Sequence, residues 1–323
     1  MLRLLIIKTS SLGDVIHNLP AVSDIGARFP DAAIDWAVEE DFADVAALHP
    51  AVARVIPVAL RRWRHAPLAP ATWCEFRDLR RALRAERYDA VLDTQGLLKS
   101  AVLARLARGA SCGQDRKTAR EPLAACFYDR TFHVARGRHA VVRNRDLAAQ
   151  ALGYALPMTP PDYGIRAPDE PPPLTVPDKF ILGLHATSRE SKLWPVAHWV
   201  ALGRALEGKG LVLVLPWGSR AEEARARAIA HGVPRAQLLP KLGLRALAVV
   251  MGRARAVVGV DTGLVHLAAA LGLPTVALYT DTSPALTGVL AADASRVRNL
   301  GDRGRVPAPD EVQRALAALG VLA

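Results

Sequence analysis

The sequence predicts an α/β protein of two Rossmann-like domains, each built on a parallel sheet. Short aliphatic runs alternate with longer helical patterns along the whole chain, which is typical of parallel strands joined by crossover helices. The chain has 323 residues, 51% of them hydrophobic, and is therefore long enough for two cores of ordinary size. The stretch 156–178 contains eight prolines and no apolar periodicity, and it separates two such alternating patterns.

The first domain is expected to span 1–165, followed by a proline-rich linker at 166–178 and a second domain at 179–323. The expected strands of the first domain are 2–7, 33–38, 52–58 and 88–93, and its expected helices are 14–28, 40–48, 73–86, 97–107 and 139–152. In the second domain we expect strands at 180–185, 211–215, 256–260 and 275–279, and helices at 195–208, 219–231, 243–252, 263–271 and 308–319. The cleft between two such domains is the expected ligand site.

The net charge of +11 is concentrated in one part of the chain. Residues 61–150 carry 19 basic and 9 acidic side chains, whereas residues 1–60 carry 4 and 8. The arginine clusters at 61–64, 77–87 and 136–145 suit an anionic partner, and Trp63 among arginines would suit a lipid headgroup region. Nucleic acid is the competing partner, and an arginine-rich composition from a GC-rich genome is the alternative without function.

The sequence carries no sign of export or of membrane insertion. The apolar run at 4–7 is too short for a signal peptide, and no later run approaches 18 uninterrupted apolar residues. We therefore expect a protein on the cytoplasmic side, without a transmembrane segment. Cys74, Cys112 and Cys126 lack the spacing of a zinc site or a disulfide framework, so they are expected to be core thiols.

Three polar segments follow predicted strands, where ligands of open parallel sheets bind. The first runs from Lys8 to Asp14 after the first strand. Gly13 would let the backbone approach a ligand, and Asp14 could accept a proton from an incoming hydroxyl. Aspartate is also favoured as a helix cap, and a cap alone would explain Asp14.

The second segment runs from His185 to Pro195. Thr187 and Ser188 supply hydroxyls just before a helix whose first turn suits Pro195. Lys192 would point its ammonium towards the same mouth, where a leaving diphosphate needs compensating charge. A solvated surface lysine is the ordinary alternative.

The third segment, Asp261 to His266, turns from a strand into a helix. Backbone amides near Thr262 and Gly263 can donate to phosphate oxygens at the positive end of the helix dipole. Asp261 could accept hydrogen bonds from sugar hydroxyls. His266 lies one turn into the helix and could reach the same site, although a structural histidine is equally common there.

Missing motifs narrow the choice of activity. No complete GxGxxG follows a strand and no GxxxxGK[ST] occurs, which argues against a dinucleotide oxidoreductase and a P-loop enzyme. Asp-x-Asp is absent as well, so the usual carboxylate pair for a metal-bridged nucleotide sugar is missing. We therefore expect no cofactor and no metal.

Taken together, these segments resemble the lipopolysaccharide heptosyltransferase family over nearly the whole chain. The matching residues are 8–14, 38–40, 55–59, 61–64, 88–91, 95–97, 118–124, 185–187 with Lys192 and 194–195, 215–218 and 260–263. The resemblance implies a GT-B fold, with two Rossmann-like domains whose parallel sheets face a central cleft. Departures from the family pattern are Ser188 for a common Thr, Leu242 for a common Met, and the turn at 280–284.

The activity implied by the resemblance is inverting transfer of L-glycero-D-manno-heptose from ADP-heptose to the inner Kdo of Kdo2-lipid A in lipopolysaccharide core biosynthesis. It places the enzyme on the cytoplasmic face of the inner membrane as a peripheral protein that binds no nucleic acid. Asp14 would be the general base, and Lys192 would stabilise the ADP leaving group. The implied donor-binding residues are Thr187, Ser188, Lys192, Glu222, Leu242, Asp261, Thr262, Gly263 and His266. Those implied for the acceptor are Ser10, Gly13, Arg61, Arg62, Arg64, Lys99, Arg120 and Arg143.

Three alternatives remain at this point. A later heptosyltransferase of the family would use a heptose acceptor, but the 185–187 and 61–64 segments favour the first-acting enzyme. A nucleotide-sugar epimerase of the same fold would need no basic, lipid-facing surface. A non-catalytic nucleotide-sugar-binding regulator would tolerate replacement of Asp14.

Overall fold

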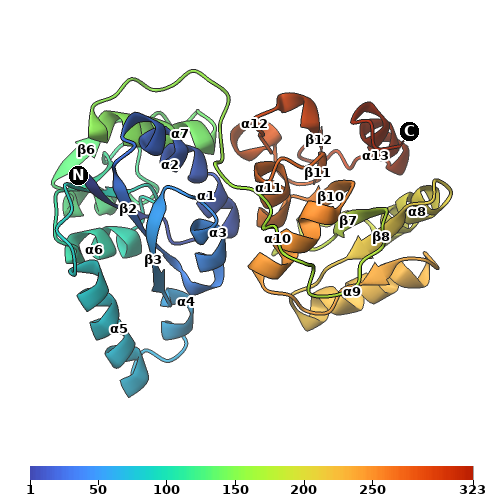
Figure 1. Cartoon of the computed structure of the whole chain (residues 1–323), viewed down its shortest axis with the longest axis horizontal. Helices are drawn as coiled ribbons and strands as arrows, with labels where there is room; N and C mark the ends of the chain where they lie inside the picture. The colour runs from blue at the N-terminus through green and yellow to red at the C-terminus, as the bar shows by residue number, and fades with distance from the viewer. Residues whose placement is uncertain (323) are drawn as a thin grey trace. The chain divides into compact units, whose positions relative to one another are not determined.

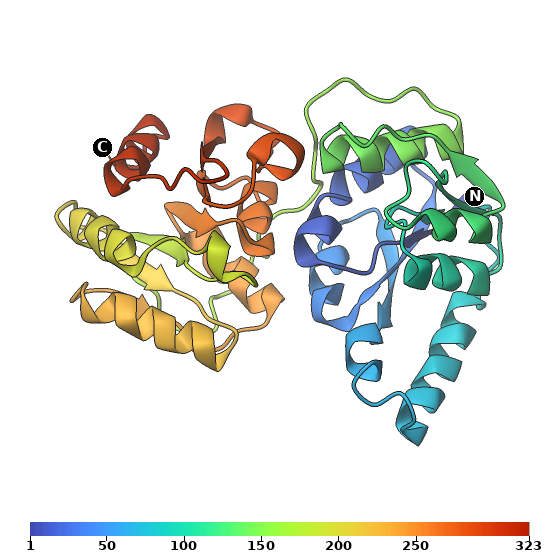
Figure 2. The ribbon, with the colours of Figure 1, turned by 180° about the vertical axis from the view of Figure 1, so that it is seen from behind.

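The computed structural model describes residues 1–322, which form two compact units, 1–164 and 165 onwards. Each unit contains one sheet of six strands, and every strand pair in both sheets is parallel. Helices cover both faces of each sheet (Figures 1 and 2). The prediction of two Rossmann-like α/β units with parallel sheets is confirmed.

Unit 1 has the Rossmann strand order β3-β2-β1-β4-β5-β6. Its strands are β1 (Arg3–Ile7), β2 (Ala33–Glu39), β3 (Val52–Val58), β4 (Ala90–Asp93), β5 (Ser111–Gln114) and β6 (Arg130–Phe132). Ile7 is level with Ala37 of β2 and Asp93 of β4, so the loops after these three strands start at the same edge. The order reverses between β1 and β4, which is where open α/β sheets bind ligands.

The helices of unit 1 lie on both faces of its sheet. They are α1 (Leu12–Ile16), α2 (Leu19–Arg28), α3 (Ala43–Ala47), α4 (Leu60–Trp63), α5 (Pro70–Leu83), α6 (Leu98–Leu106) and α7 (Ala140–Leu152), with 3-10 turns η1 (Glu40–Phe42) and η2 (Pro122–Phe127). Buried side chains of α4, α5 and α6 form one core with Leu5, Ile7 and Val91 of the sheet. Helices α2 and α7 pack against each other.

Unit 2 repeats this plan in its own order, β12-β11-β10-β7-β8-β9. Its strands are β7 (Phe180–Leu184), β8 (Val212–Leu215), β9 (Gln237–Leu238), β10 (Ala256–Val260), β11 (Thr275–Tyr279) and β12 (Val297–Gly301). The helices are α8 (Val196–Glu207), α9 (Arg220–His231), α10 (Leu244–Arg253), α11 (Gly263–Ala270), α12 (Pro284–Thr287) and α13 (Pro309–Ala318), with 3-10 turns η3 (Glu190–Lys192) and η4 (Ala294–Arg296). The reversal of order lies between β7 and β10.

The core of unit 2 is built around two tryptophans. Trp194 and Trp199 are fully buried and meet edge to face, with ring centroids 5.1 Å apart. They pack with buried residues of α8, α9 and α13 against one face of the sheet. Because Trp194 fixes the chain between η3 and α8, it also fixes the polar segment that follows β7.

Several predicted elements differ from the structure. The helix predicted at 14–28 is two helices, α1 and α2, since α2 begins after Asn18 and Pro20 has no N–H to donate to a continuing helix. The helix predicted at 40–48 begins with the 3-10 turn η1. Strands β5, β6, β9 and β12 and the short helices α4 and α12 were not predicted.

The prediction of core thiols is wrong for two of the three cysteines. Cys112 is buried in β5, but Cys74 and Cys126 are exposed. Cys74 lies on the outer side of α5, where the helix period turns it away from buried Leu79 and Leu83.

The proline-rich stretch contains neither helix nor strand. Helix α7 ends at Gly153, whose φ of 74° lies in the left-handed region that glycine adopts without strain. No regular element follows before β7, and the division between the two units falls between Gly164 and Ile165. Across residues 1–322, no helix has both the length and the apolar character needed to cross a bilayer.

Candidate active site

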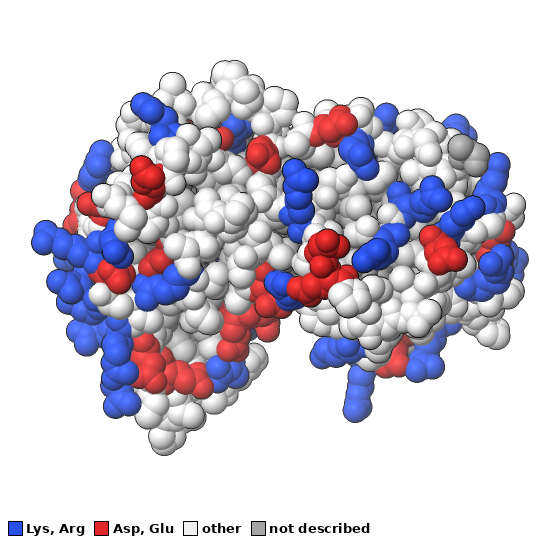
Figure 3. All heavy atoms as spheres, in the orientation of Figure 1, with Lys and Arg blue, Asp and Glu red and all other residues white. Residues whose placement is uncertain are grey.

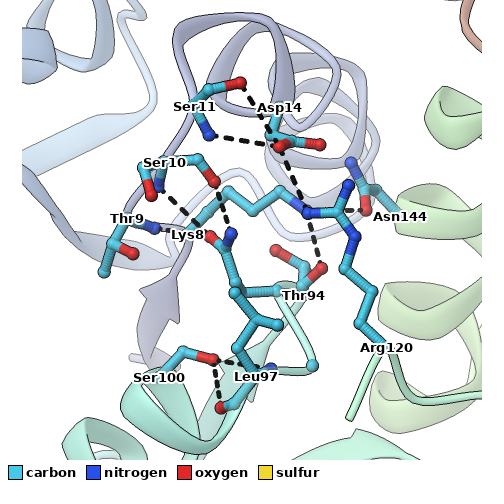
Figure 4. Close-up of polar contacts among 12 residues, drawn as sticks. Lys8, Thr9, Ser10, Ser11, Asp14, Thr94, Leu97, Ser100, Arg120 and Asn144 are labelled. Atoms are coloured by element: carbon cyan, nitrogen blue, oxygen red, sulfur yellow. Dashed lines mark hydrogen bonds and ion pairs between the residues drawn. The ribbon is translucent and has the colours of Figure 1, made fainter.

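The segment that follows β1 places Asp14 at the ligand-binding edge of unit 1. Ser11 is the N-cap of α1, and its N–H donates to Asp14 Oδ2 at 3.1 Å (Figure 4). Asp14 therefore lies in the first turn and does not occupy the cap position itself. The sequence offered a capping role for Asp14, and the structure shows one: Ser11 and Asp14 form a capping box, in which the Asp14 side chain accepts the N–H of the N-cap residue.

Asp14 is surrounded by cations. Arg120 Nη1 lies 3.4 Å from Asp14 Oδ2, and the Asp14 side chain is 21% exposed. Burial would raise the pKa of Asp14, but the Lys8 ammonium and the Arg120 guanidinium, with the Ser11 N–H, hold it below its ordinary value. The carboxylate is therefore ionised at neutral pH and keeps a solvent-accessible edge.

Lys8 is the residue of this site to which the sequence gave no role. Its ammonium is buried and donates to the Thr94 carbonyl at 2.7 Å and to Asn144 Oδ1 at 3.4 Å (Figure 4). Burial lowers its pKa to about 8, although Asp14 opposes this shift. A lysine directly after a buried apolar strand was the available signal, because lysine is rarely buried without a partner.

Gln95, in the loop after β4, fixes the backbone of this segment. Its Oε1 accepts the N–H groups of Thr9 and Ser10 at 2.9 and 3.2 Å, and its amide donates to the Ser10 carbonyl. Lys99 Nζ donates to Ser10 Oγ at 3.2 Å. Ser10 and Lys99, both predicted from the sequence, thus lie together, and Gly13 is part of the same turn in α1.

Arg143, on α7, belongs to the same cationic group. Burial, followed by the effect of Arg120, lowers its pKa, while Asp14 raises it. Its Nε is buried and has no hydrogen-bond partner within residues 1–322. Arg120 and Arg143 are therefore brought together with Lys8 around Asp14, as positive charges available to an anionic ligand.

The arginines at 61–64 divide into different environments. The Arg61 N–H donates to Glu39 Oε1 at 2.7 Å, and its guanidinium lies 4.8 Å from the centroid of the Phe42 ring. Glu39 ends β2, and although its burial raises its pKa, Arg61 and Lys99 are both near enough to lower it. Glu39 thereby links Arg61 to the Ser10 side of the site.

Of the other members of this cluster, Arg62 and Trp63 are already engaged by neighbouring carboxylates. Arg62 already pairs with Glu40 at 3.0 Å and Glu75 at 2.9 Å, whereas Arg64 is exposed. Trp63 is not a headgroup-facing side chain, because it is 8% exposed and donates from Nε1 to Glu75 Oε2 at 2.6 Å. That part of the prediction is wrong, since α5 packs over Trp63.

Unit 2 carries a pocket of about 280 Å³ at the carboxyl ends of β7 and β8. One part of its lining is apolar, with Leu184, Pro216, Trp217, Leu242, Leu244, Leu247 and Leu264. Another part carries polar side chains predicted from the sequence: Thr187, Ser188, Glu222 and Thr262. A mostly apolar pocket with a few convergent polar groups is the usual form of a small-molecule site.

Lys192 and Asp261 form an ion pair beside this pocket. Lys192 Nζ lies 2.6 Å from Asp261 Oδ2, and the two side chains are 18% and 11% exposed. Thr282 Oγ1 donates to the same carboxylate oxygen at 2.6 Å, and Thr187 Oγ1 donates to the Asp261 carbonyl at 3.0 Å. Lys192 is therefore not a solvated surface lysine but is held at the carboxyl end of β10.

The remaining predicted donor residues lie at helix starts. Glu222 is in the first turn of α9 and accepts the Gly218 N–H at 2.7 Å, so part of its hydrogen-bonding capacity is used locally. Gly263 opens α11 after Thr262. His266 is buried within that helix and is not among the residues that line the pocket.

Two sheets of Rossmann order, one with an ionised carboxylate among cations and the other with an apolar pocket edged by hydroxyls and a lysine, fit a glycosyltransferase of the GT-B fold. The profile of glycosyltransferase family 9 (heptosyltransferase) matches residues 76–315. The chain belongs to this family, and it is a glycosyltransferase.

The relatives agree with this assignment. Lipopolysaccharide heptosyltransferase 1 of Escherichia coli K12 is 48% identical over 288 residues, covering 89% of this chain and 90% of the relative. The structure of E. coli heptosyltransferase WaaC with ADP superposes with a TM-score of 0.89 and 42% identity, covering 98% and 99% of the two chains. WaaC with ADP-2-deoxy-2-fluoro heptose gives a TM-score of 0.86 at the same identity and coverage. The family resemblance and the GT-B fold inferred from the sequence are confirmed.

Proposed function

We propose that this enzyme transfers L-glycero-D-manno-heptose from ADP-heptose to the inner Kdo of Kdo2-lipid A in lipopolysaccharide core biosynthesis, with inversion at the anomeric carbon. Its similarity to proteins named lipopolysaccharide heptosyltransferase 1 supports the reaction class. The observation that carries the proposal is the ionised Asp14 carboxylate, held among Lys8, Arg120 and Arg143 at the switch point of unit 1.

The pocket of unit 2 suits an adenosine diphosphate sugar. Its leucines and Trp217 offer apolar surface to a flat base, and Glu222 can accept from ribose hydroxyls. Thr187, Ser188 and the amides that open α11 can donate to the diphosphate. The structures of WaaC with ADP and with a fluorinated ADP-heptose are in keeping with such a donor.

Lys192 is the group that would stabilise the leaving ADP. Its ammonium is paired with Asp261 beside the pocket, which holds it in position before the donor arrives. As the glycosidic bond breaks, negative charge grows on the diphosphate, and a fixed cation stabilises that charge most in the transition state. We propose that this lysine and the helix terminus replace a metal ion, so that the reaction needs none.

Asp14 would act as the base. The Kdo hydroxyl loses its proton to the Asp14 carboxylate while its oxygen attacks the anomeric carbon from the side opposite to ADP. A diphosphate leaves without being protonated, so one carboxylate suffices, whereas glycoside hydrolysis needs an acid as well. One direct displacement inverts the anomeric centre and forms no covalent glycosyl-enzyme.

The acceptor would be bound by the cations of unit 1. Arg120 and Arg143, which act on Asp14, and Lys99, which binds Ser10, would meet the Kdo carboxylates, and Arg61 and Arg64 would meet the lipid A phosphates. Arg62 would have to leave Glu40 and Glu75 to take part. An enzyme that uses such an acceptor would act on the cytoplasmic face of the inner membrane as a peripheral protein. The cleft between the two domains, in which both substrates would meet, stays a prediction.

Mass spectrometry of the acceptor tests the reaction. Purified enzyme with ADP-heptose, Kdo2-lipid A and a chelator should yield an acceptor heavier by one heptose, with the inverted anomeric configuration by NMR. No mass gain with verified substrates would overturn the proposal. A preference for an acceptor that already bears heptose would favour a later-acting heptosyltransferase, and isomerisation of the donor alone would favour an epimerase.

The variant Asp14→Asn tests the base separately from the fold. An asparagine side-chain oxygen can still accept the Ser11 N–H, so α1 should form, but it cannot take up a proton at neutral pH. We expect kcat to fall about 10²- to 10⁴-fold. Asp44→Asn is the matched control, because Asp44 is an exposed carboxylate in the first turn of α3. Near-full turnover of Asp14→Asn would show that Asp14 is only structural.

A further inference from the structure

Helix α5 and the turn before it project from unit 1 and end in exposed apolar side chains. The first turns of α5 are the part of this helix farthest from the sheet (Figures 1 and 2). Leu68, in the turn, is 86% exposed, and Trp73, in the first turn of the helix, is 62% exposed. Of the six tryptophans, all within residues 1–322, Trp73 is exposed and the other five are buried or half-buried.

This exposure occurs on an ordered element. Thr72 Oγ1 donates to the Ala66 carbonyl at 2.8 Å, and the Ala69 N–H donates to the same carbonyl at 3.2 Å, which closes the turn that displays Leu68. On the other side of α5, Leu79 and Leu83 are buried in the core. The helix is thus anchored by one face, and Trp73 points away from that face.

Arginines follow Trp73 along the outer side of α5. Positions 73, 77, 80, 81 and 84 recur at the helical period and therefore share one side of the helix. Arg77 and Arg81 are 68% and 73% exposed, and Arg80 and Arg84 are exposed as well. Figure 3 shows basic side chains along this edge of unit 1 above an uncharged tip.

Few carboxylates offset this charge. Asp78 lies 3.1 Å from Arg81 and 4.0 Å from Arg77, and all three side chains are more than half exposed, so these pairs are weak. The other acidic side chain of α5, Glu75, is already paired with Arg62 and Trp63. The outer side of α5 therefore keeps a net positive charge.

We propose that this surface, formed by Leu68, Trp73, Arg77, Arg80, Arg81 and Arg84, docks the enzyme on an anionic lipid bilayer. Leucine and tryptophan at the projecting end would enter the boundary between headgroups and acyl chains, and the arginines behind them would meet lipid phosphates. A surface that binds nucleic acid would need only the positive charge and would have no use for the exposed Leu68 and Trp73. The inference deepens the proposed function, since a lipid-borne acceptor requires an enzyme at the membrane, but it involves no substrate.

Vesicle binding without donor or acceptor tests the surface. The enzyme should cosediment with phosphatidylglycerol-containing vesicles and not with pure phosphatidylcholine, and the partition coefficient should fall as salt is raised. The triple variant R77Q/R80Q/R81Q should weaken binding about 100-fold, from roughly a fivefold loss for each arginine. The variant L68S/W73S should weaken it by about 30-fold or more, and it should abolish a vesicle-induced blue shift of tryptophan emission.

Two control variants make the test specific. R227Q/R235Q/R255Q removes three exposed arginines of unit 2 and should leave vesicle binding unchanged. L123S/F127S removes two further exposed apolar side chains of unit 1, on η2, and should also leave vesicle binding unchanged. All variants should keep wild-type heptosyl transfer to an acceptor dispersed in detergent.

Three results of the vesicle assay would overturn the proposal: equal binding to neutral and anionic vesicles, loss of binding in L123S/F127S but not in L68S/W73S, or no vesicle binding at all. The last result with intact heptosyl transfer would refute only the docking surface. Vesicle binding without heptosyl transfer would refute only the proposed reaction. Self-association through the tip, lost in L68S/W73S, would instead identify a protein interface and would also overturn it.

Discussion

Arg120→Met should shift the pH dependence of transfer, because Arg120 stabilises the ionised form of Asp14. Arg120 Nη1 lies 3.4 Å from Asp14 Oδ2. Two unit charges at that separation attract by about 1.2 kcal/mol at the dielectric constant of water and about 4.9 kcal/mol at an effective value of 20. The Arg120 side chain is 48% exposed, so the lower figure applies.

Since one pH unit corresponds to about 1.36 kcal/mol, the acidic limb of the pH profile should move up by about one unit. The sign follows from the chemistry. Arg120 lowers the pKa of Asp14, and its removal raises that pKa, so more of the base is protonated at a given acidic pH. The assay is kcat/KM for the acceptor, at saturating donor, because this parameter reports ionisations of the enzyme before the acceptor binds.

Because Arg120 is also a proposed acceptor-binding residue, its replacement can lower the maximum of kcat/KM. A lower maximum does not change the pH at which the acidic limb falls. Arg138→Met is the matched control, since Arg138 is an exposed arginine that pairs with Asp146 at 3.2 Å. It should leave the limb in place. If Arg120→Met is folded and its acidic limb coincides with that of the wild type, Asp14 is not the group whose ionisation controls transfer.

Three further predictions concern the lysines and the metal requirement. The buried Lys8 has a pKa of about 8 in the folded state, whereas an exposed lysine has its ordinary pKa of 10.5, so the unfolded chain binds more protons between these values. The free energy of unfolding should therefore rise by about 3 kcal/mol from this group between pH 8 and pH 10.5. Urea unfolding of Lys8→Met should not show this rise, whereas Lys99→Met, which removes an exposed lysine, should show it. Lys192→Met should lower kcat about 10²- to 10³-fold, whereas Lys209→Met, at an exposed position, should match the wild type; equal rates for the two would remove Lys192 from the mechanism. Exhaustive chelation should leave the transfer rate within about twofold, and restoration by Mg²⁺ of a lost activity would contradict a metal-free site.

The sequence predicts the inner strands of both sheets well, because their burial on both faces requires continuous aliphatic runs. It fails at β5, where Ser111, Cys112, Gly113 and Gln114 are all buried although none is a strong strand former. A Cβ at Gly113 would lie only 2.2 Å from Tyr128 Cε2, so this strand is selected by close packing that no local pattern reveals. The outer strands β6, β9 and β12 are short or partly exposed and give no clearer signal.

The sequence also could not predict side-chain environments that depend on residues far away in the chain. Trp63 and Trp73 both lie near arginines in the sequence, yet Glu75 and the packing of α5 bury the first and leave the second exposed. Lys8 acquires its low pKa from burial, in a place where the ammonium meets Thr94 and Asn144, which are separated from it by 86 and 136 residues. Motifs could place polar segments at strand ends, but only the tertiary structure shows which charges they share.

The sequence posed Asp14 as either a helix cap or a catalytic base, and the geometry shows that these roles do not compete. The Ser11 N–H and the Arg120 guanidinium both contact Oδ2, while Oδ1 carries neither contact. The cap fixes the carboxylate at the start of α1, and the cations Lys8 and Arg120 keep it ionised in spite of its burial. A base that is already oriented and charged needs little reorganisation when the acceptor hydroxyl arrives. The structural contact would therefore help Asp14 to act as the proposed base, and the same argument applies to the proposed role of Lys192, which Asp261 holds in place.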